Sequence, residues 1–240
     1  LLDKIPKFTQ NKYFETFVDL KNLKTEPLKI SEYWSSAQLK INLNNEVNFF
    51  KTHNACASYK DRWFTDEKNT MGYIYVVRDP RAVACSNANH SNLTIEDSVN
   101  DLLNENLIGF NGDYNLAELP SSWKINYLSW KKKKKFDGII IKYEDLIDNT
   151  KLELKKILLF LQKNMNIPIN EEKISKTINS CIFSNLSQLE DKYGFKEAEK
   201  NKFFWKGAKD SWKIDLNQDL RKKIEISFKD EMIELGYLKK

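Results

Sequence analysis

The sequence predicts an α/β fold built on a parallel β-sheet. Residues 73–77 and 139–141 are short apolar runs rich in β-branched or aromatic residues, as expected of strands covered on both faces. Segments with helical periodicity follow both runs, and strands that alternate with helices are typical of parallel sheets. The chain has 240 residues, of which 41% are hydrophobic and 30% charged, which fits one globular domain with a substantial core.

The remaining elements are predicted from local patterns. Residues 1–45 show no clear period, and residues 47–51 predict a strand that is followed by a polar loop. Pro80 comes just after the strand at 73–77 and predicts a helix that ends near His90, because proline fixes φ close to its helical value. Apolar residues spaced three and four apart predict further helices, over residues 95–107, 123–130, 154–161, 174–178 and 220–232.

The composition narrows the class of protein. There are 39 Lys and Arg residues against 34 Asp and Glu, so the net charge is +5 and suits an anionic ligand. Much of the excess is the lysine run at 131–135, and such runs usually cover a solvated face. The three cysteines lack CxxC spacing, so they predict reduced thiols, a cytoplasmic location and no zinc site. No apolar run approaches the length of about 18 residues that a transmembrane helix needs, and no secretory signal is evident.

Polar side chains follow three predicted strands at the point where each strand ends. Arg78 follows one of them, with Ser86 eight residues later in the predicted helix; Lys51 and His53 end a second strand, and Tyr143 follows the third. Ligands of α/β proteins bind at the carboxyl ends of the strands. These residues therefore predict a pocket in which arginine and serine bind an anion and histidine acts as a general base. Taken alone, Arg78 can equally serve as a surface ion-pair partner, and His53 as a core hydrogen-bonding group.

Five motifs in order carry a family resemblance. They are Lys51-Thr52-His53, the segment 75–86 with Arg78 and Ser86, Lys142-Tyr143-Glu144-Asp145-Leu146, Ile182-Phe183-Ser184-Asn185-Leu186, and the basic loop 203–213. Together they resemble the cytosolic-type and bacterial sulfotransferases, which use 3′-phosphoadenosine 5′-phosphosulfate (PAPS) and release 3′-phosphoadenosine 5′-phosphate (PAP). The resemblance covers residues 48–237. It implies a P-loop-NTPase-like three-layer sandwich, with a central parallel β-sheet flanked by helices, in a single domain over residues 1–240.

The resemblance also implies roles for individual residues. His53 takes the acceptor's proton and Lys51 stabilises charge on the bridging oxygen, while no metal is required. The residues expected to bind the nucleotide are Arg78 and Ser86 at the 3′-phosphate, Tyr143 and Cys181 at the polar edge of adenine, Phe183 on its face, and Lys206 and Gly207 at the 3′-phosphate. The acceptor is expected to be a small alcohol, phenol, lipid-like molecule or sugar bound by loops that carry Trp63, Phe64, Phe110 and Tyr114. No nucleic acid or membrane is expected as a partner, and the oligomeric state is open.

Two departures from the family pattern leave alternatives open. The family's Pro-Lys-Ser-Gly-type loop, which binds the 5′-phosphosulfate, is absent from these residues, and no glycine precedes Gly72. Because the chain does not begin with Met, we expect that loop upstream of Leu1; the alternative is a catalytically degenerate nucleotide-binding member. In the late loop, Trp205 stands where the family has arginine and Asp210 where it has glycine. A third possibility is a nucleic-acid-binding module that uses the lysine run with neighbouring aromatic residues.

Overall fold

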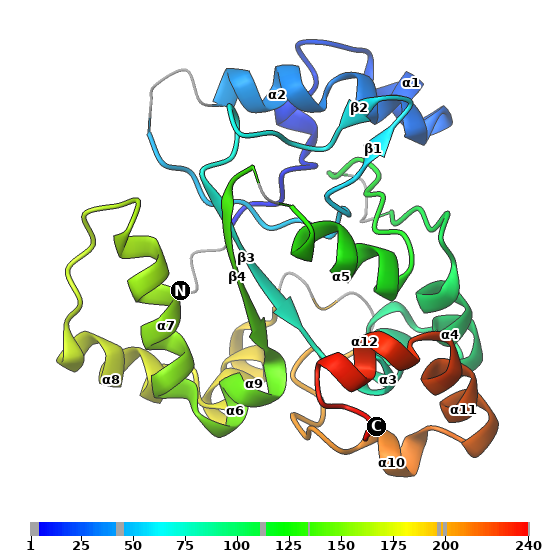
Figure 1. Cartoon of the computed structure of the whole chain (residues 1–240), viewed down its shortest axis with the longest axis vertical. Helices are drawn as coiled ribbons and strands as arrows, with labels where there is room; N and C mark the ends of the chain where they lie inside the picture. The colour runs from blue at the N-terminus through cyan, green and yellow to red at the C-terminus, as the bar shows by residue number, and fades with distance from the viewer. Residues whose placement is uncertain are drawn as a thin grey trace. The chain divides into compact units, whose positions relative to one another are not determined.

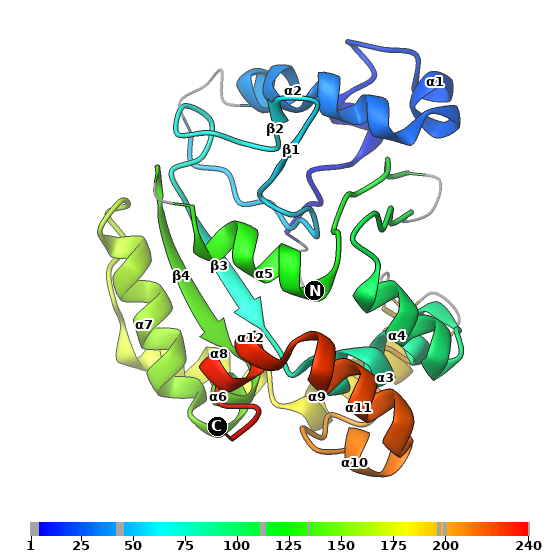
Figure 2. The same ribbon diagram turned by 45° about the vertical axis from the view of Figure 1, so that its right-hand side comes forward.

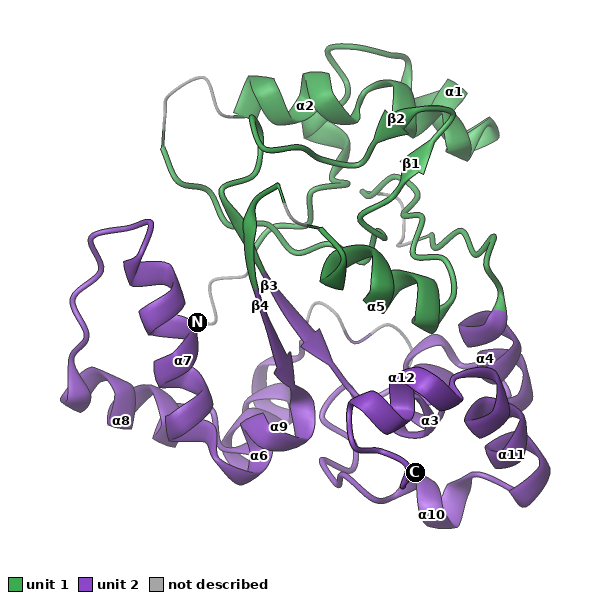
Figure 3. Ribbon diagram, in the orientation of Figure 1, with its two compact units in different colours: residues 1–73, 104–138 green, residues 74–103, 139–240 purple. Residues whose placement is uncertain are grey.

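The computed structural model describes residues 5–41, 46–110, 114–133, 135–195, 198 and 201–239 (Figures 1 and 2). They group into two compact units (Figure 3). Unit 1 consists of Leu1–Tyr73 and Asn104–Gly138, and unit 2 of Ile74–Leu103 and Ile139–Lys240. The single sulfotransferase domain expected over residues 1–240 stays a prediction. None of the helices in the described ranges is long and apolar enough to cross a membrane.

Unit 1 is built around an aromatic core. The Phe64 ring lies edge-on to the rings of Phe8, Trp34 and Trp130, with centroids 5.4 to 6.2 Å apart, a favourable geometry for aromatic pairs. Its elements are the 3₁₀ helices η1 (Asn11–Tyr13) and η2 (Pro27–Glu32), the helices α1 (Leu20–Thr25), α2 (Trp34–Ile41) and α5 (Trp123–Lys131), and the antiparallel strands β1 (Ser58–Tyr59) and β2 (Arg62–Trp63).

The strand predicted at residues 47–51 is wrong over most of its length. Only Lys51 pairs, in a single parallel bridge to Lys7. Lys51 N donates to Pro6 O at 2.9 Å, and Phe8 N donates to Lys51 O at 3.1 Å. Pro6 has no N–H to donate back, so the ladder cannot extend through it.

Strands β3 (Gly72–Val77) and β4 (Asp137–Lys142) confirm the two predicted core strands. They pair in a small parallel sheet, and their arrowheads lie at the same end in Figures 1 and 2. The burial expected on both faces is incomplete, however, because Ile74 and Val76 of β3 are 36% and 50% exposed. The α/β class is confirmed, while complete burial of this strand is not.

Unit 2 surrounds these strands with helices. The helix predicted from Pro80 is confirmed as α3, and the helix predicted over 95–107 ends early at Leu103. Asn104 Oδ1 accepts from Asn106 N at 2.9 Å, and this local turn competes with another helical turn. The helices are α3 (Pro80–Ser91), α4 (Ile95–Leu103), α6 (Tyr143–Asp148), α7 (Thr150–Gln162), α8 (Glu171–Ser180), α9 (Phe183–Tyr193), α10 (Trp212–Asp215), α11 (Gln218–Ser227) and α12 (Lys229–Glu234).

A buried arginine joins the β3–α3 turn to the C-terminal part of unit 2. Arg81 is 5% exposed and donates to Asp79 through Nε at 3.0 Å and Nη2 at 2.6 Å. It also donates to Glu225 Oε1 at 2.5 Å and to the Tyr237 carbonyl at 3.0 Å. Its guanidinium lies 3.9 Å from the centre of the Trp212 ring, a cation–π contact. A charge so deeply buried is stable only because these partners surround it.

We predict that Glu225→Gln lowers stability near neutral pH and much less in acid. Burial alone would raise the pKa of Glu225, but hydrogen bonds from Arg221 and Arg81 outweigh it and hold the pKa below its ordinary value of 4.5. A carboxylate with a lowered pKa stabilises the fold above pH 4.5, and this contribution is lost as pH falls through the folded-state pKa. Urea unfolding at several pH values measures the effect, with the exposed Glu105→Gln as control. A difference between wild type and variant that does not shrink in acid would contradict the prediction.

Candidate functional site

In unit 1, the segment Lys51-Thr52-His53 is held by hydrogen bonds to its main chain. The His53 N–H donates to Glu118 Oε1 at 2.8 Å, and the His53 carbonyl accepts from Asn126 Nδ2 at 3.0 Å. The His53 side chain is exposed, so its ring is accessible while its backbone is fixed on both sides. Lys51 lies two residues before it and pairs with Lys7 through the main chain.

In unit 2, Arg78 and Tyr143 come together where β3 and β4 end. The Arg78 guanidinium carbon lies 4.3 Å from the centre of the Tyr143 ring, within cation–π distance. The next residue, Asp79, donates its N–H to Glu144 Oε1 at 3.1 Å, which joins the two strand ends. The planar guanidinium of Arg78 is therefore held at the strand edge where the sequence places it.

Helix α3 begins at a carboxylate cap and carries Ser86. The Asp79 side chain caps the helix by accepting from Arg81 N at 2.9 Å, and the Ser86 side chain is exposed two turns along. Burial raises the pKa of the Cys85 thiol to about 11; the negative charges of Asp215 and Asp79 act in the same direction, and the positive charges of Lys206 and Arg78 oppose it.

Phe183 and Gly207 also meet. Gly207 has φ of +62°, and a Cβ added there would lie 2.6 Å from the Phe183 ring, so no other residue fits without displacing it. Phe183 is 38% exposed and begins α9, which leaves part of the ring available. Cys181, two residues before, is exposed as a free thiol.

The loop that carries Gly207 is held by a buried carboxylate. Glu190 is 9% exposed and accepts from the backbone amides of Phe203 and Phe204 at 2.6 and 2.8 Å. The two phenylalanine rings pack on Phe195 with centroids 4.8 and 5.4 Å apart. Carboxylate bonds to main-chain amides are charge-assisted, so Glu190 fixes the entry to this loop.

The cations of the same loop already have carboxylate partners. Lys206 Nζ lies 2.8 and 2.6 Å from the two Asp215 oxygens and 4.1 Å from the centre of the Trp205 ring. Lys209 forms an ion pair with Asp148. An anion that binds Lys206 must therefore share it with Asp215 or displace that carboxylate.

The structure thus brings four of the predicted nucleotide residues of unit 2 together in two contacts, Arg78 with Tyr143 and Phe183 with Gly207. The predicted catalytic pair of unit 1, Lys51 and His53, lies on one segment. Sequence reasoning missed Glu118 and Glu190. A signal for Glu118 was present, because it is the one acid within the apolar run 116–119.

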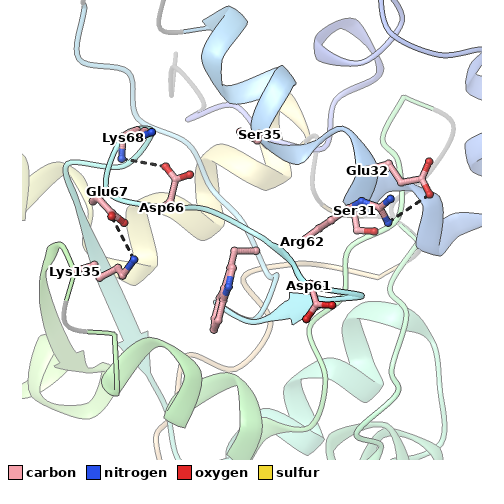
Figure 4. Close-up of a pocket in the computed structure, with 10 residues that line it drawn as sticks. Ser31, Glu32, Ser35, Asp61, Arg62, Asp66, Glu67, Lys68 and Lys135 are labelled. Carbon is pink, nitrogen blue, oxygen red and sulfur yellow. Dashed lines mark hydrogen bonds and ion pairs between the residues drawn. The ribbon is translucent and has the colours of Figure 1, made fainter.

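Neither of two cavities in the described residues is lined by a predicted catalytic or nucleotide-binding residue, but Trp63, expected at the acceptor, lines the cavity in unit 1. The one in unit 1 has a volume of about 520 Å³ (Figure 4), and the one in unit 2 of about 380 Å³. Around the first, charges are neutralised in pairs: Arg62 lies 3.5 Å from Glu32, and Lys135 lies 3.3 Å from Glu67 (Figure 4). A charged ligand therefore gains little from this cavity.

Of the aromatic residues expected at the acceptor site or beside the lysine run, some are buried and others are exposed. Trp130 and Phe136 beside the lysine run are 7% and 8% exposed, so they are not available to stack on bases. Phe64, expected at the acceptor, is a core residue at 4%, which corrects that expectation. Trp63, Phe110 and Tyr114 are 53%, 64% and 84% exposed.

Known proteins agree with the fold and the motifs. The chain is 30% identical to Sulfotransferase 1B1 of Canis lupus familiaris over 111 residues, which are 43% of this chain and 36% of the relative. It is 23% identical to the amine sulfotransferase of Oryctolagus cuniculus over 176 residues, 69% of this chain and 56% of the relative. The chain therefore spans between about a third and just over half of the length of these relatives.

Solved structures show the same fold. Mouse sulfotransferase SULT7A1 complexed with PAP has a TM-score of 0.56 at 22% identity, and the match covers 80% of this chain and 68% of that one. A retinol dehydratase in a complex with retinol and PAP has a TM-score of 0.59 at 22% identity, covering 92% and 65%. These likenesses confirm the predicted P-loop-like α/β fold. The model of the sulfotransferase domain matches residues 3–236, so the chain belongs to the sulfotransferase family.

Proposed function

We propose that the protein transfers a sulfuryl group from PAPS to a hydroxyl or amine of a small-molecule acceptor. The contact that carries the proposal is Arg78 against Tyr143 at 4.3 Å, at adjacent strand ends of a chain of this family. Ser86, exposed on α3, and Lys206 are proposed to add a hydroxyl and an ammonium group to the planar cation of Arg78. These are the donors that a 3′-phosphate requires.

Adenine recognition is assigned to the contact between Phe183 and Gly207. The partly exposed Phe183 ring offers an aromatic face, and the absence of a side chain at Gly207 lets the loop backbone approach that ring. Tyr143 and Cys181 offer polar groups for the edge of the base. Two structural neighbours, mouse sulfotransferase SULT7A1 and a retinol dehydratase, are complexes with PAP, which supports this assignment.

In the proposed reaction, His53 removes the proton from the acceptor O–H or N–H. A bond forms between the acceptor atom and sulfur as the bond from sulfur to the phosphate oxygen of PAPS breaks, and PAP leaves with the electron pair. Lys51 stabilises the negative charge that develops on that oxygen. The protein contributes positioning and charge neutralisation rather than a covalent intermediate, as in phosphoryl transfer. No step needs a metal.

The phosphosulfate-binding loop is proposed to belong to a segment outside these 240 residues. The acceptor class stays a proposal as well: an alcohol, phenol, lipid-like molecule or sugar. A cytoplasmic location is supported by the buried free thiols Cys56 and Cys85, whose pKa values burial raises to about 11.

We predict that PAP binds at least about tenfold more tightly than adenosine 5′-monophosphate, because the latter lacks the 3′-phosphate and its charge-assisted hydrogen bonds. Arg78→Met should remove most of this difference, and Arg62→Met, which changes an exposed arginine of β2, should leave it intact. Isothermal titration calorimetry measures all six affinities. Equal binding of the two nucleotides by the wild type would refute the role given to Arg78 and Ser86.

A second prediction concerns Gly207→Ala, which should weaken PAP binding because the new Cβ displaces the Phe183 ring. The matched control is Gly194→Ala, since Gly194 has a similar φ of +70° but open space around its Cβ. The control should cost only backbone strain of about 1–3 kcal/mol in stability, because φ of 70° with ψ of 170° is a conformation that essentially only glycine adopts, with PAP affinity unchanged. If both variants bind PAP like the wild type, Phe183 does not form the adenine face.

A third prediction is that His53→Ala in the complete natural protein lowers the turnover rate by about 100-fold or more while PAP affinity is retained, because the base acts in the transfer step. Transfer of radiolabelled sulfate from PAPS and PAP calorimetry provide the two readouts. Unchanged turnover excludes His53 as the base. PAP binding without transfer in the wild type identifies a catalytically degenerate member instead.

A further inference from the structure

Glu118 is among the most deeply buried ionisable side chains described in unit 1, with 1% of its surface exposed. Its own main chain pairs with Gly109, donating at 2.9 Å and accepting at 2.8 Å, so its position is fixed independently of its side chain. A carboxyl group taken out of water is destabilising unless hydrogen bonds replace the lost hydration. The hydrogen bonds of the Glu118 carboxylate must therefore offset the cost of its burial.

Those contacts converge on the segment with the proposed base. Glu118 Oε1 accepts from the His53 N–H at 2.8 Å and from the Thr52 hydroxyl at 3.4 Å. The Thr52 oxygen accepts in turn from Asn54 N at 3.0 Å and Asn54 Nδ2 at 2.9 Å. One carboxylate oxygen thus binds two consecutive residues directly and a third through Thr52.

The residues beside Glu118 hold the same segment from its other side. Asn54 Oδ1 accepts from Leu119 N at 2.7 Å. Asn126 Nδ2 donates both to the His53 carbonyl at 3.0 Å and to the Pro120 carbonyl at 2.8 Å. The N–H and the C=O of His53 are therefore both bonded to side chains, which leaves its backbone little freedom.

We infer that Glu118 is a positioning residue for sulfuryl transfer, and this inference rests on the proposed function. Glu118 fixes the N–H of His53, and the fixed backbone sets the direction in which the exposed imidazole projects. Lys51, two residues away, is held separately by its main-chain bonds to Pro6 and Phe8. Transfer depends on placement of the base to within about 1 Å, so loss of this bond should lower turnover more than it lowers donor binding.

The experiment uses the complete natural protein and compares Glu118→Ala, Glu118→Asp and Glu118→Gln. Alanine removes the acceptor and aspartate withdraws it by one methylene, so both should lower kcat by about tenfold to 100-fold with KM for PAPS changed little. Glutamine keeps an acceptor oxygen at the same reach and should restore most of kcat. The matched control is Glu153→Ala, a buried glutamate of α7 at 4% exposure, which should lose stability without a change in kcat.

Amide hydrogen exchange at His53 supplies a readout that does not need activity. The rate should rise by about tenfold in Glu118→Asp relative to the wild type, as expected for loss of one hydrogen bond, and stay near wild type in Glu118→Gln. If the alanine variant does not fold, aspartate alone carries the test. Wild-type kcat in Glu118→Asp, or equal loss of kcat in Glu118→Gln and Glu118→Ala, overturns the positioning role.

Failure of the two ideas can be told apart. If the wild type transfers no sulfuryl group, the proposed function fails, whatever the exchange rates show. If the wild type is active and His53→Ala is inactive, but Glu118→Asp retains full turnover, only the positioning role fails. Support requires the fall in kcat, its recovery by glutamine, and the change in His53 exchange together.

Discussion

The ion pair between Arg81 and Asp79 is the contact on which unit 2 depends most. It lies at the turn from β3 to α3, and through Glu225, the Tyr237 carbonyl and Trp212 it reaches α11, the C-terminal residues and α10. Removing one partner of such a buried pair costs about 3–5 kcal/mol, because the other charge is left without compensation. The turn that it fixes also presents Arg78. A structural ion pair and a proposed ligand contact therefore lie within the four residues 78–81.

The sequence was sufficient for the elements whose signal is local. The strands at 73–77 and 139–141 and the helix after Pro80 are marked by apolar runs and by a proline, and all three are present. The strand at 47–51 has the same kind of pattern and fails, since pairing also needs a neighbour that can donate, which Pro6 cannot. The hairpin of β1 and β2 escaped prediction because its strands have two residues each, too few to show alternation.

At the candidate site, the motifs predicted the functional residues better than the residues that hold them in place. The Arg78–Tyr143 and Phe183–Gly207 contacts join residues that the motifs already singled out. Glu118 was not predicted, because its role lies in a bond to a backbone amide 65 positions away; its place in an apolar run marks it as unusual but does not show what it binds. Main-chain amides have no sequence signature, so residues that act on them become visible only in three dimensions.

If Lys206 binds the nucleotide as proposed, its pair with Asp215 makes that binding an exchange of one anion for another. A phosphate that reaches Lys206 meets an ammonium group that already has a carboxylate at 2.6 Å. The net gain is the difference between two anions competing for one cation, rather than the full attraction of a bare charge. Under the proposed function, the affinity of a phosphate for Lys206 is set by competition with Asp215, and the ion pair re-forms when the product leaves.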